Sequence, residues 1–315
     1  MARRKLKFSM VIFFSIAMLC LFFMQMNVLD FGTIFPKMGS DYTISWDDIN
    51  RTFILLPKVD CKKNPPYLVL LITTSHHQKE ARMAIRQSWG KNREILGQRV
   101  SAFFLLGTSG NVQKEAELAN ESLAYNDIIQ RPFVDAYYNL TIKTVMGIDW
   151  ISERCPETKF VMKTDADMFV NTVYLVELLR HKTQSNFFTG FLKLDEYPIR
   201  NIFSKWYVSK REFPGVRYPP FCSGTGYVFS ADVAQKLHKL PSTIPFFKLE
   251  DVFVGLCLER LKIDLQELHS EQTFFPEKPY FSTCRYKRLV TSHGHRPDDI
   301  TVYWALLERS GHETC

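Results

Sequence analysis

The chain has 315 residues, of which 46% are hydrophobic and 14% are aromatic, and its formal net charge is +7. The length allows one large folded domain or two small ones, and the composition is that of an ordinary folded protein with a sizeable core. Four of the positive residues lie within residues 1–7, and the others form no basic run interleaved with aromatic residues. The net charge is therefore no sign of nucleic-acid binding.

An uncharged apolar stretch, residues 8–29, follows this basic tail. It is long enough to cross the ~30 Å hydrocarbon core of a bilayer. Basic residues flank only its amino side, so the positive-inside rule keeps residues 1–7 cytosolic and sends the chain after Leu29 across the membrane. We predict an uncleaved type II signal-anchor. A cleaved signal peptide is the alternative, although the apolar stretch is long and its end lacks a small-x-small site.

The part of the chain beyond the predicted anchor has features of an oxidising compartment. Sequons for N-glycosylation are found at Asn50, Asn120 and Asn139. Cys20 falls within the predicted anchor, which leaves six cysteines: Cys61, Cys155, Cys222, Cys257, Cys284 and Cys315. We expect disulfides among them, with a buried free thiol as the alternative for each cysteine. Their spacing does not choose among the possible pairings, and the lack of CxxC spacing argues against a zinc site.

Residues 30–66 show no clear periodicity, and we predict a stem that spaces a catalytic domain, residues 67–315, from the membrane. Strand-like apolar runs then alternate with helical patterns. The predicted strands cover residues 67–73, 100–107, 127–130 and 160–164, and the predicted helices cover residues 77–90, 111–124 and 140–154. This order predicts an α/β fold, a parallel sheet with helices on both faces. After Phe169 the pattern becomes mixed, as expected for an acceptor-binding half built onto a nucleotide-binding half.

Two aspartates, Asp165 and Asp167, come directly after the predicted strand at residues 160–164. Carboxylates at i and i+2 of extended backbone lie on the same face, and their charges repel unless a cation lies between them. A hard divalent cation suits them, because Mg²⁺ and Mn²⁺ prefer oxygen ligands and often share them with substrate phosphates. The pair therefore predicts a metal-bridged nucleotide site at the carboxyl end of the sheet. A solvated turn is the alternative.

Two arginines, Arg82 and Arg86, share one face of the helix that follows the first predicted strand. This is the rim where ligands bind in open α/β sheets, so we predict contacts with uridine or diphosphate. A solvated helix face is the alternative.

An acidic pair, Glu250 and Asp251, opens a predicted apolar helix at residues 249–261. Carboxylates are favoured at helix starts by capping and by the helix dipole, which is the structural interpretation. The functional interpretation is a general base, which requires a carboxylate beside the attacking hydroxyl.

Gly224 and Gly226 precede an apolar strand and would let the backbone approach a ligand closely, with a tight turn as the alternative. Aromatic residues precede them and offer platforms for sugar rings, with core packing as the alternative: Trp206, Tyr207, Phe213 and Tyr218. Downstream, His293 and His295 are each a candidate metal ligand or a surface histidine.

Six segments together resemble the β-1,3-galactosyltransferase family, glycosyltransferase family 31. They are AIRQSWG (84–90), FFLLG (103–107), YYNLTIKT (137–144), FVMKTDADMFVN (160–171), YPPFCSGTGYVFS (218–230) and EDVFVG (250–255). They run in family order over essentially the whole part beyond the predicted stem. The family often has Asp-Asp-Asp where this chain has Ala166 in the middle. That change matters little, because the middle side chain points away from the outer two.

The resemblance implies a GT-A fold, a Rossmann-like sheet with helices on both faces, behind an N-terminal transmembrane helix. It implies a Golgi type II membrane enzyme whose catalytic domain is lumenal. The implied reaction moves galactose from UDP-galactose, with inversion, to the 3-hydroxyl of a terminal β-linked GlcNAc on glycoproteins or glycolipids, with Mn²⁺ as cofactor. A terminal GalNAc on a globo-type glycolipid is a further implied acceptor.

The resemblance also implies roles for individual residues. Asp167 is the direct metal ligand, Asp165 lies by the ribose and the metal, and His293 is the metal histidine. Asp251 is the general base, and Arg82 and Arg86 hold UDP. We expect four residues to line the acceptor or sugar pocket: Trp206, Gly224, Gly226 and Glu250. The suggested disulfides are Cys155–Cys222, Cys257–Cys284 and Cys61–Cys315.

Two other functions remain open at this point. A β-1,3-N-acetylglucosaminyltransferase that uses UDP-GlcNAc shares these motifs. A membrane-anchored glycan-binding or chaperone protein with a dead site belongs to another class. The presence of both aspartates, His293 and Asp251 speaks against a dead site.

Overall fold

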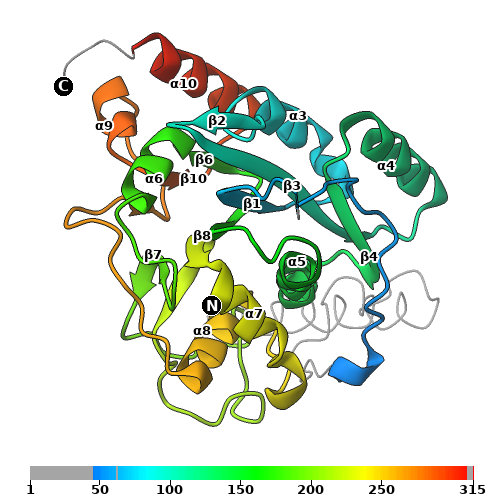
Figure 1. Ribbon diagram of the computed structural model, residues 1–315. Helices are drawn as coiled ribbons and strands as arrows, with labels where there is room; N and C mark the ends of the chain where they lie inside the picture. The colour runs from blue at the N-terminus through cyan, green and yellow to red at the C-terminus, as the bar shows by residue number, and fades with distance from the viewer. Residues whose placement is uncertain (1–44, 62, 311–314) are drawn as a thin grey trace, which may run out of the picture. The chain divides into compact units, whose positions relative to one another are not determined.

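The computed structural model describes residues 45–61, 63–310 and 315 (Figure 1). The predicted cytosolic tail and anchor, residues 1–29, lie outside these described residues. Within the described part of the chain, no helix combines the length and the apolar character needed to span a membrane. Residues 199–214 belong to one compact unit, and the other described residues belong to a second, larger unit.

A seven-stranded sheet forms the centre of the larger unit, with the order β2-β3-β1-β5-β8-β7 and β4 paired to β3 (Figure 1). Strands β4, β3, β1 and β5 run parallel, whereas β2, β8 and β7 are antiparallel to their neighbours. The bounds are β1 Leu68–Thr73, β2 Arg93–Ile95, β3 Gln98–Thr108, β4 Ile128–Val134, β5 Phe160–Asp165, β7 Phe188–Lys193 and β8 Phe221–Ser230. The predicted parallel strands are therefore confirmed, each within a few residues of its expected ends.

Helices connect and cover these strands. Their bounds are α3 Lys79–Gln87, α4 Val112–Tyr125, α5 Leu140–Arg154, α6 Thr172–Leu179, α7 Ala231–His238, α8 Glu250–Leu261, α9 Thr283–Lys287 and α10 Pro297–Arg309. Short 3-10 helices are η1 Trp46–Asp48, η2 His76–Gln78, η3 Tyr137–Asn139 and η4 Pro241–Thr243. Local signals set several ends: Asn111 caps α4 through a hydrogen bond from Lys114 N, and Asn126 ends it in the left-handed conformation.

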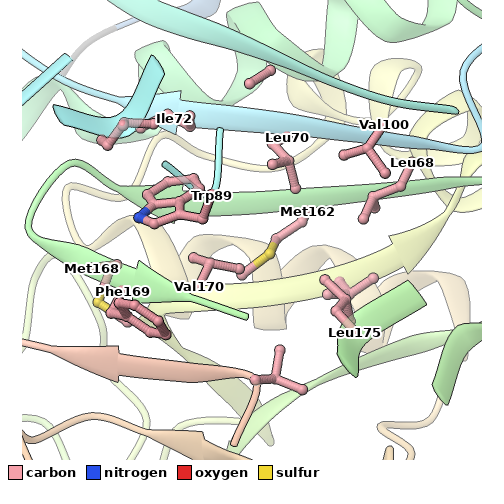
Figure 2. Packing of buried hydrophobic residues seen from close by; sticks show 14 of the residues in the cluster. Leu68, Leu70, Ile72, Trp89, Val100, Met162, Met168, Phe169, Val170 and Leu175 are labelled. Carbon is pink, nitrogen blue, oxygen red and sulfur yellow. The ribbon is translucent and has the colours of Figure 1, made fainter. Parts of the chain in front are cut away.

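The core lies on both faces of the sheet, as predicted from the apolar runs. Leu68, Leu70 and Ile72 of β1 are fully buried in one cluster with Trp89 and with residues of α3 and α6 (Figure 2). The opposite face meets α5 at Gly147, where a Cβ atom would lie 2.9 Å from Leu71 Cδ1 and 2.8 Å from Leu105 Cδ1. The glycine therefore allows α5 to approach the sheet closely.

A second, three-stranded sheet lies beyond β5, with the order β6-β10-β9. Its strands are β6 Met168–Val170, β9 Phe274–Phe275 and β10 Thr291–His293, and β6 and β10 pair antiparallel with Met168 opposite His293. This pairing joins the segment after Asp167 to a part of the chain that is far away in the sequence. This sheet was not predicted from the sequence, because strands of two or three residues give too short a pattern.

The predicted stem is wrong for its described part, residues 45–61 and 63–66, because this segment packs onto the larger unit. Trp46 is buried, and its Nε1 donates a hydrogen bond to Ile244 O at 2.8 Å. Further along, Ile54 N donates to Gln130 O, and Gln130 N donates to Leu55 O. These bonds extend the edge of the sheet at β4, so the folded domain begins before Tyr67.

The hydrogen bonds within the smaller unit, residues 199–214, include backbone bonds and bonds from Arg200. Val208 N donates to Ile199 O, and Arg200 donates from Nη1 to Val208 O and from Nη2 to Phe213 O, both at 2.8 Å. Trp206 lies in this unit with 47% of its surface exposed. Core packing, the alternative for this aromatic residue, is therefore wrong.

The disulfide pairs implied by the resemblance are also wrong. The structure joins Cys61 to Cys155 and Cys284 to Cys315, and it leaves Cys222 and Cys257 as buried thiols. Cys61 precedes β1 and Cys155 precedes β5. Because β1 and β5 are parallel neighbours, both cysteines lie at the same edge of the sheet, with their Cα atoms 5.0 Å apart. For Cys222 and Cys257, the structure confirms the alternative, a buried free thiol.

The three sequons differ in exposure. Asn50 and Asn120 are exposed, whereas Asn139 is only 7% exposed and its Nδ2 donates to Val134 O at 2.8 Å. Asn139 precedes α5, and its hydrogen bond to Val134 O fastens the loop before that helix.

Candidate active site

The ends of β1 and β5 bring the first aspartate into place. Thr73 and Asp165 are opposite each other in the parallel register, and Thr73 Oγ1 donates to Asp165 Oδ1 at 2.5 Å. Ala166 N then donates to Thr73 O, and Ala166 is buried, while the side chains of Asp165 and Asp167 are 31% and 48% exposed. The middle side chain thus points away from the outer two, as the sequence analysis expected. The two carboxylates open to solvent at the carboxyl end of the sheet.

The second sheet brings His293 to Asp167. His293 Nε2 lies 3.2 Å from Asp167 Oδ2, and its Nδ1 lies 3.1 Å from Pro276 O. The hydrogen bond with Asp167 raises the pKa of His293, although burial opposes this. Burial also opposes ionisation of Asp167, but its hydrogen bond with His293 leaves the pKa of Asp167 below the usual value. His295, the other candidate, is buried beside Ser292, and burial lowers its pKa to about 4.

The donor set of Asp167 and His293 can be compared with what a divalent cation needs. Among the described residues, no group of three or more His, Cys, Asp or Glu side chains is placed to hold a metal ion alone. Asp167 and His293 offer one carboxylate and one imidazole, and the bond from Nδ1 to Pro276 O favours the tautomer that leaves Nε2 free for a metal. Mg²⁺ and Mn²⁺ often take one or two protein ligands plus waters and substrate phosphates. The pair therefore fits a cation that binds together with a nucleotide diphosphate.

Asp251 lies in the first turn of α8, against β8. Its Oδ2 accepts a hydrogen bond from Gly224 N at 3.2 Å, and its Oδ1 accepts one from Val252 N at 2.9 Å. The N-cap of α8 is Leu249, so the acidic pair does not occupy the capping position itself. A Cβ atom on Gly224 would lie 3.2 Å from Glu250 Oε2, which shows how closely the strand approaches the helix here.

The carboxyl group of Asp251 has an unusual environment for an aspartate. Burial raises its pKa to about 6, the charge of Glu250 adds to this, and the bonds from Val252 N and Gly224 N oppose it. The residue nevertheless keeps part of its surface exposed. A carboxylate with such a pKa is ionised at neutral pH and is still basic enough to take a proton.

A buried lysine connects the two aspartate sites. Lys163 Nζ donates to Asp165 Oδ1 at 2.8 Å and to Gly224 O at 2.6 Å, and it lies 3.4 Å from Glu250 Oε2. Burial alone would lower the pKa of Lys163, but the charges of Asp165 and Glu250 raise it above the usual value. Lys163 therefore stays charged. Gly224 bonds Lys163 through its carbonyl and Asp251 through its N–H, so only two hydrogen bonds and one residue separate Lys163 from Asp251.

Glu250, expected in an acceptor or sugar pocket, is instead buried beneath Asp251. Its side chain is 4% exposed, and its Oε1 accepts a hydrogen bond from Tyr227 Oη at 2.5 Å. Gly226 is likewise buried, opposite Thr164 in the β5–β8 register, and lines no surface. Gly224 remains at the surface of the site. Gly224 and Gly226 lie inside β8 rather than before it, and neither has a positive φ, so the tight-turn alternative is wrong.

Arg82 and Arg86 are buried and paired with carboxylates of the protein itself. Arg82 is 1% exposed, and its Nε and Nη2 donate to the two carboxylate oxygens of Glu121 at 2.7 and 2.6 Å. Arg86 donates to both oxygens of Asp127 and to Glu121, and its guanidinium lies over the Tyr125 ring. The expected direct contacts with UDP and the solvated-face alternative both disagree with this geometry, because the charges are buried and paired within the protein.

Arg82 still acts close to the site. Its Nη1 donates to Ser75 O at 2.7 Å, in the loop that leaves β1 just after Thr73. The buried ion pair therefore fixes the loop beside Asp165 rather than contacting a ligand.

Sequence reasoning missed four residues of the site: Thr73, Lys163, Tyr227 and Pro276. Lys163 carried a usable signal, because a lysine inside a buried strand needs an internal partner and the nearest carboxylate is two residues away. Thr73 and Tyr227 depend on strand register, and Pro276 depends on a loop position. A single sequence gives no such information.

Comparisons with known proteins point to one family. A family profile described as Galactosyltransferase matches residues 80–269. β-1,3-galactosyltransferase 5 of Homo sapiens is 49% identical over 319 aligned residues, which cover 100% of this chain and 99% of the relative. β-1,3-galactosyltransferase 2 of Homo sapiens is 42% identical over 291 residues, which cover 90% of this chain and 68% of the relative. Among solved structures, the bifunctional glycosyltransferase WbbM is 13% identical, covers 80% of this chain and 51% of its own, and has a TM-score of 0.43, too low to carry an argument.

The fold is a mixed α/β, Rossmann-like glycosyltransferase fold with an acidic site at the carboxyl end of its sheet. The chain belongs to the galactosyltransferase family, and it is a galactosyltransferase enzyme. Within that family it is about half identical, over its full length, to β-1,3-galactosyltransferase 5.

Proposed function

We propose that this enzyme moves galactose from UDP-galactose to the 3-hydroxyl of a terminal β-linked GlcNAc, with inversion at the anomeric carbon. The observation that carries the proposal is the position of Asp251, which lies two hydrogen bonds and one residue from Lys163, the partner of Asp165. A nucleotide-side carboxylate and a carboxylate with a pKa near 6 thus share one site. The choice of galactose and of the β-1,3 linkage is supported by the similarity to β-1,3-galactosyltransferases 5 and 2.

The reaction needs one displacement, because UDP-galactose is α-linked and the product is β-linked. Asp251 takes the proton from the acceptor 3-hydroxyl. At the same time the oxygen of that hydroxyl forms a bond to C1 of galactose, and the bond from C1 to UDP breaks. Gly224 N holds the Asp251 carboxylate during this step. Asp167 and His293, with Asp165 nearby, would hold a divalent cation, for which we propose Mn²⁺. When bound, such a cation neutralises charge on the UDP leaving group.

We further propose a GT-A fold and a type II Golgi membrane enzyme whose catalytic domain is lumenal. The basic tail and the uncharged stretch at residues 8–29 support the membrane topology. Acceptors on both glycoproteins and glycolipids belong to the proposal, including a terminal GalNAc on globo-type glycolipids.

A donor and acceptor panel tests this function. The full chain, purified in detergent, is assayed with UDP-galactose and UDP-GlcNAc against a β-linked GlcNAc glycoside, with Mn²⁺ or with a chelator. We expect transfer from UDP-galactose only, dependence on the cation, and a β-1,3 linkage by NMR of the product. Preference for UDP-GlcNAc would replace the donor. Glycan binding without transfer from either donor would indicate a dead site.

A further inference from the structure

Lys163 has an unusual position for a lysine. It lies in the middle of β5, and its side chain is only 2% exposed. Burying a charged ammonium is costly unless it is paired and hydrogen-bonded, so a lysine here requires partners of its own. The mechanism proposed above gives it no chemical role.

The partners of Lys163 come from three parts of the site. An ammonium has three N–H donors. Two hydrogen bonds reach Asp165 Oδ1 at 2.8 Å and Gly224 O at 2.6 Å, and the ammonium also forms an ion pair with Glu250 Oε2 at 3.4 Å. Asp165 ends β5, Gly224 lies on β8, and Glu250 opens α8. The lysine therefore contacts β5, β8 and α8, the three elements that position Asp165 and Asp251.

Two of the partners of Lys163, Asp165 and Gly224, also have a second hydrogen bond within the site. Asp165 accepts from Thr73 as well, which fixes its carboxylate at the end of β1. Gly224 donates its N–H to Asp251. Without the ammonium, Asp165 and Glu250 would lose their shared counter-charge, and the Gly224 carbonyl would lose its donor.

We propose that Lys163 is a positioning residue, which holds the nucleotide-side carboxylate of Asp165 and the Gly224 peptide that carries Asp251 in one fixed arrangement. The assignment of Asp165 to the nucleotide and of Asp251 to the acceptor rests on the proposed function. The side chain of Lys163 is only 2% exposed and so presents almost no surface to a substrate. It acts through the two groups that it bonds.

Arg131 provides a matched control. It is also a buried cation, 2% exposed, and its Nη1 lies 2.5 Å from Asp149 Oδ2. Its guanidinium also lies over the ring of Phe53, and His238 Nδ1 lies 2.6 Å from Asp149 Oδ1; none of these residues belongs to the candidate site. Loss of Arg131 leaves the buried Asp149 with His238 as its remaining ion-pair partner, and loss of Lys163 removes the cation beside the buried Glu250, so both variants should lose stability. Only loss of Lys163 should also disturb the site.

The test uses the full chain in detergent and compares Lys163→Met with Arg131→Met. Three quantities are measured for each: thermal unfolding, calorimetric binding of UDP in the presence of Mn²⁺, and kcat and KM for the donor that the wild type uses. For Lys163→Met we expect about tenfold weaker UDP binding and a fall in kcat of about 10–100-fold. For Arg131→Met we expect a lower Tm with unchanged UDP binding and kcat.

Equal behaviour of the two variants, with UDP binding and kcat both retained, would overturn the proposal. If Lys163→Met does not fold, Lys163→Gln decides the question, because it keeps two N–H donors and loses the charge. Failure of both to fold would make Lys163 a purely structural residue and would also overturn the proposal. UDP is common to both donors, so UDP binding tests the role of Lys163 independently of the donor assignment. A wild type that uses UDP-GlcNAc would refute the proposed function, but the effect of the Lys163 variants could still be measured.

Discussion

Two charged clusters lie near the carboxyl ends of the parallel strands, and they differ in how their charges are balanced. In the arginine cluster, Arg82 and Arg86 are matched by Glu121 and Asp127, and all four side chains are at most 10% exposed. In the acidic cluster, Asp165, Asp167, Glu250 and Asp251 outnumber their cationic partners, Lys163 and His293, and part of the cluster is open. A balanced, closed cluster holds structure. An unbalanced, open one has charge left for a cation and a substrate.

The largest expected effect is on chemistry in the acidic cluster. Asp251→Asn keeps an acceptor for Gly224 N and removes the base. We expect kcat to fall by about 10²–10⁴-fold, the usual contribution of general base catalysis, while UDP binding with Mn²⁺ is unchanged. Steady-state kinetics and calorimetry on the same preparation measure both. Substantial remaining activity would refute the assignment of Asp251 as the base.

The arginine cluster should respond in stability instead. Arg82→Met leaves Glu121 buried without its main partner, and breaking a buried pair in this way costs about 3–5 kcal/mol. For a domain of this size that corresponds to a Tm lower by roughly 6–20 °C. The double variant Arg82→Met/Glu121→Met should recover much of the loss, because no buried charge stays unpaired.

The same variants test whether Arg82 contacts the donor. We expect the UDP affinity of the folded Arg82→Met protein to stay close to that of the wild type. An unchanged Tm together with lost UDP binding would restore the direct contact predicted from the sequence and would remove the distinction between the two clusters.

The metal side of the acidic cluster should show a smaller effect. Asp167→Ala removes the carboxylate beside His293, so the part of UDP affinity that depends on Mn²⁺ should disappear. We expect about 10–100-fold weaker binding with Mn²⁺ and no change with a chelator present. Calorimetry with and without Mn²⁺ separates the two. Mn²⁺-dependent binding that survives in Asp167→Ala would show that Asp167 is not the ligand.

The two clusters also show what a single sequence can predict. Buried strands and the position of Asp165 and Asp167 at a strand end were predictable, because an unbroken apolar run such as Leu68–Thr73 has few alternatives and because the pair directly follows such a run. The spacing of Arg82 and Arg86 put them on one helix face correctly. It could not show that Glu121 and Asp127, about 40 residues away, would cover that face.

The remaining errors have the same cause. The pairing of Cys61 with Cys155 depends on the adjacency of β1 and β5, and the position of His293 beside Asp167 depends on the register of β6 and β10. Strands this short carry no periodicity, so only the resemblance singled out His293. Burial of Asn139 and packing of the described stem likewise depend on contacts between distant segments.

The smallest expected effect is a pH shift, which tests how the acidic cluster tunes its base. Asp251 is active when ionised, and its pKa is about 6. With UDP-galactose and Mn²⁺ saturating, so that protonation of His293 does not limit binding, kcat should rise with pH up to about 6 and then level off. Glu250→Gln removes the negative charge that raises the pKa of Asp251, so the break should move to lower pH.

The other groups near Asp251 do not produce this shift. Lys163 lowers the pKa of Asp251 and stays in place in the Glu250→Gln variant, while burial raises the pKa of Tyr227 and of Cys222 so that both stay protonated. Glutamine also keeps an oxygen that accepts from Tyr227 Oη, so the packing beneath the base is preserved. An unmoved break in Glu250→Gln, with kcat otherwise intact, would mean that the titrating group is not Asp251. The proposal that the acidic cluster tunes the pKa of its own base would then be wrong, and the contrast with the arginine cluster would need another titrating residue.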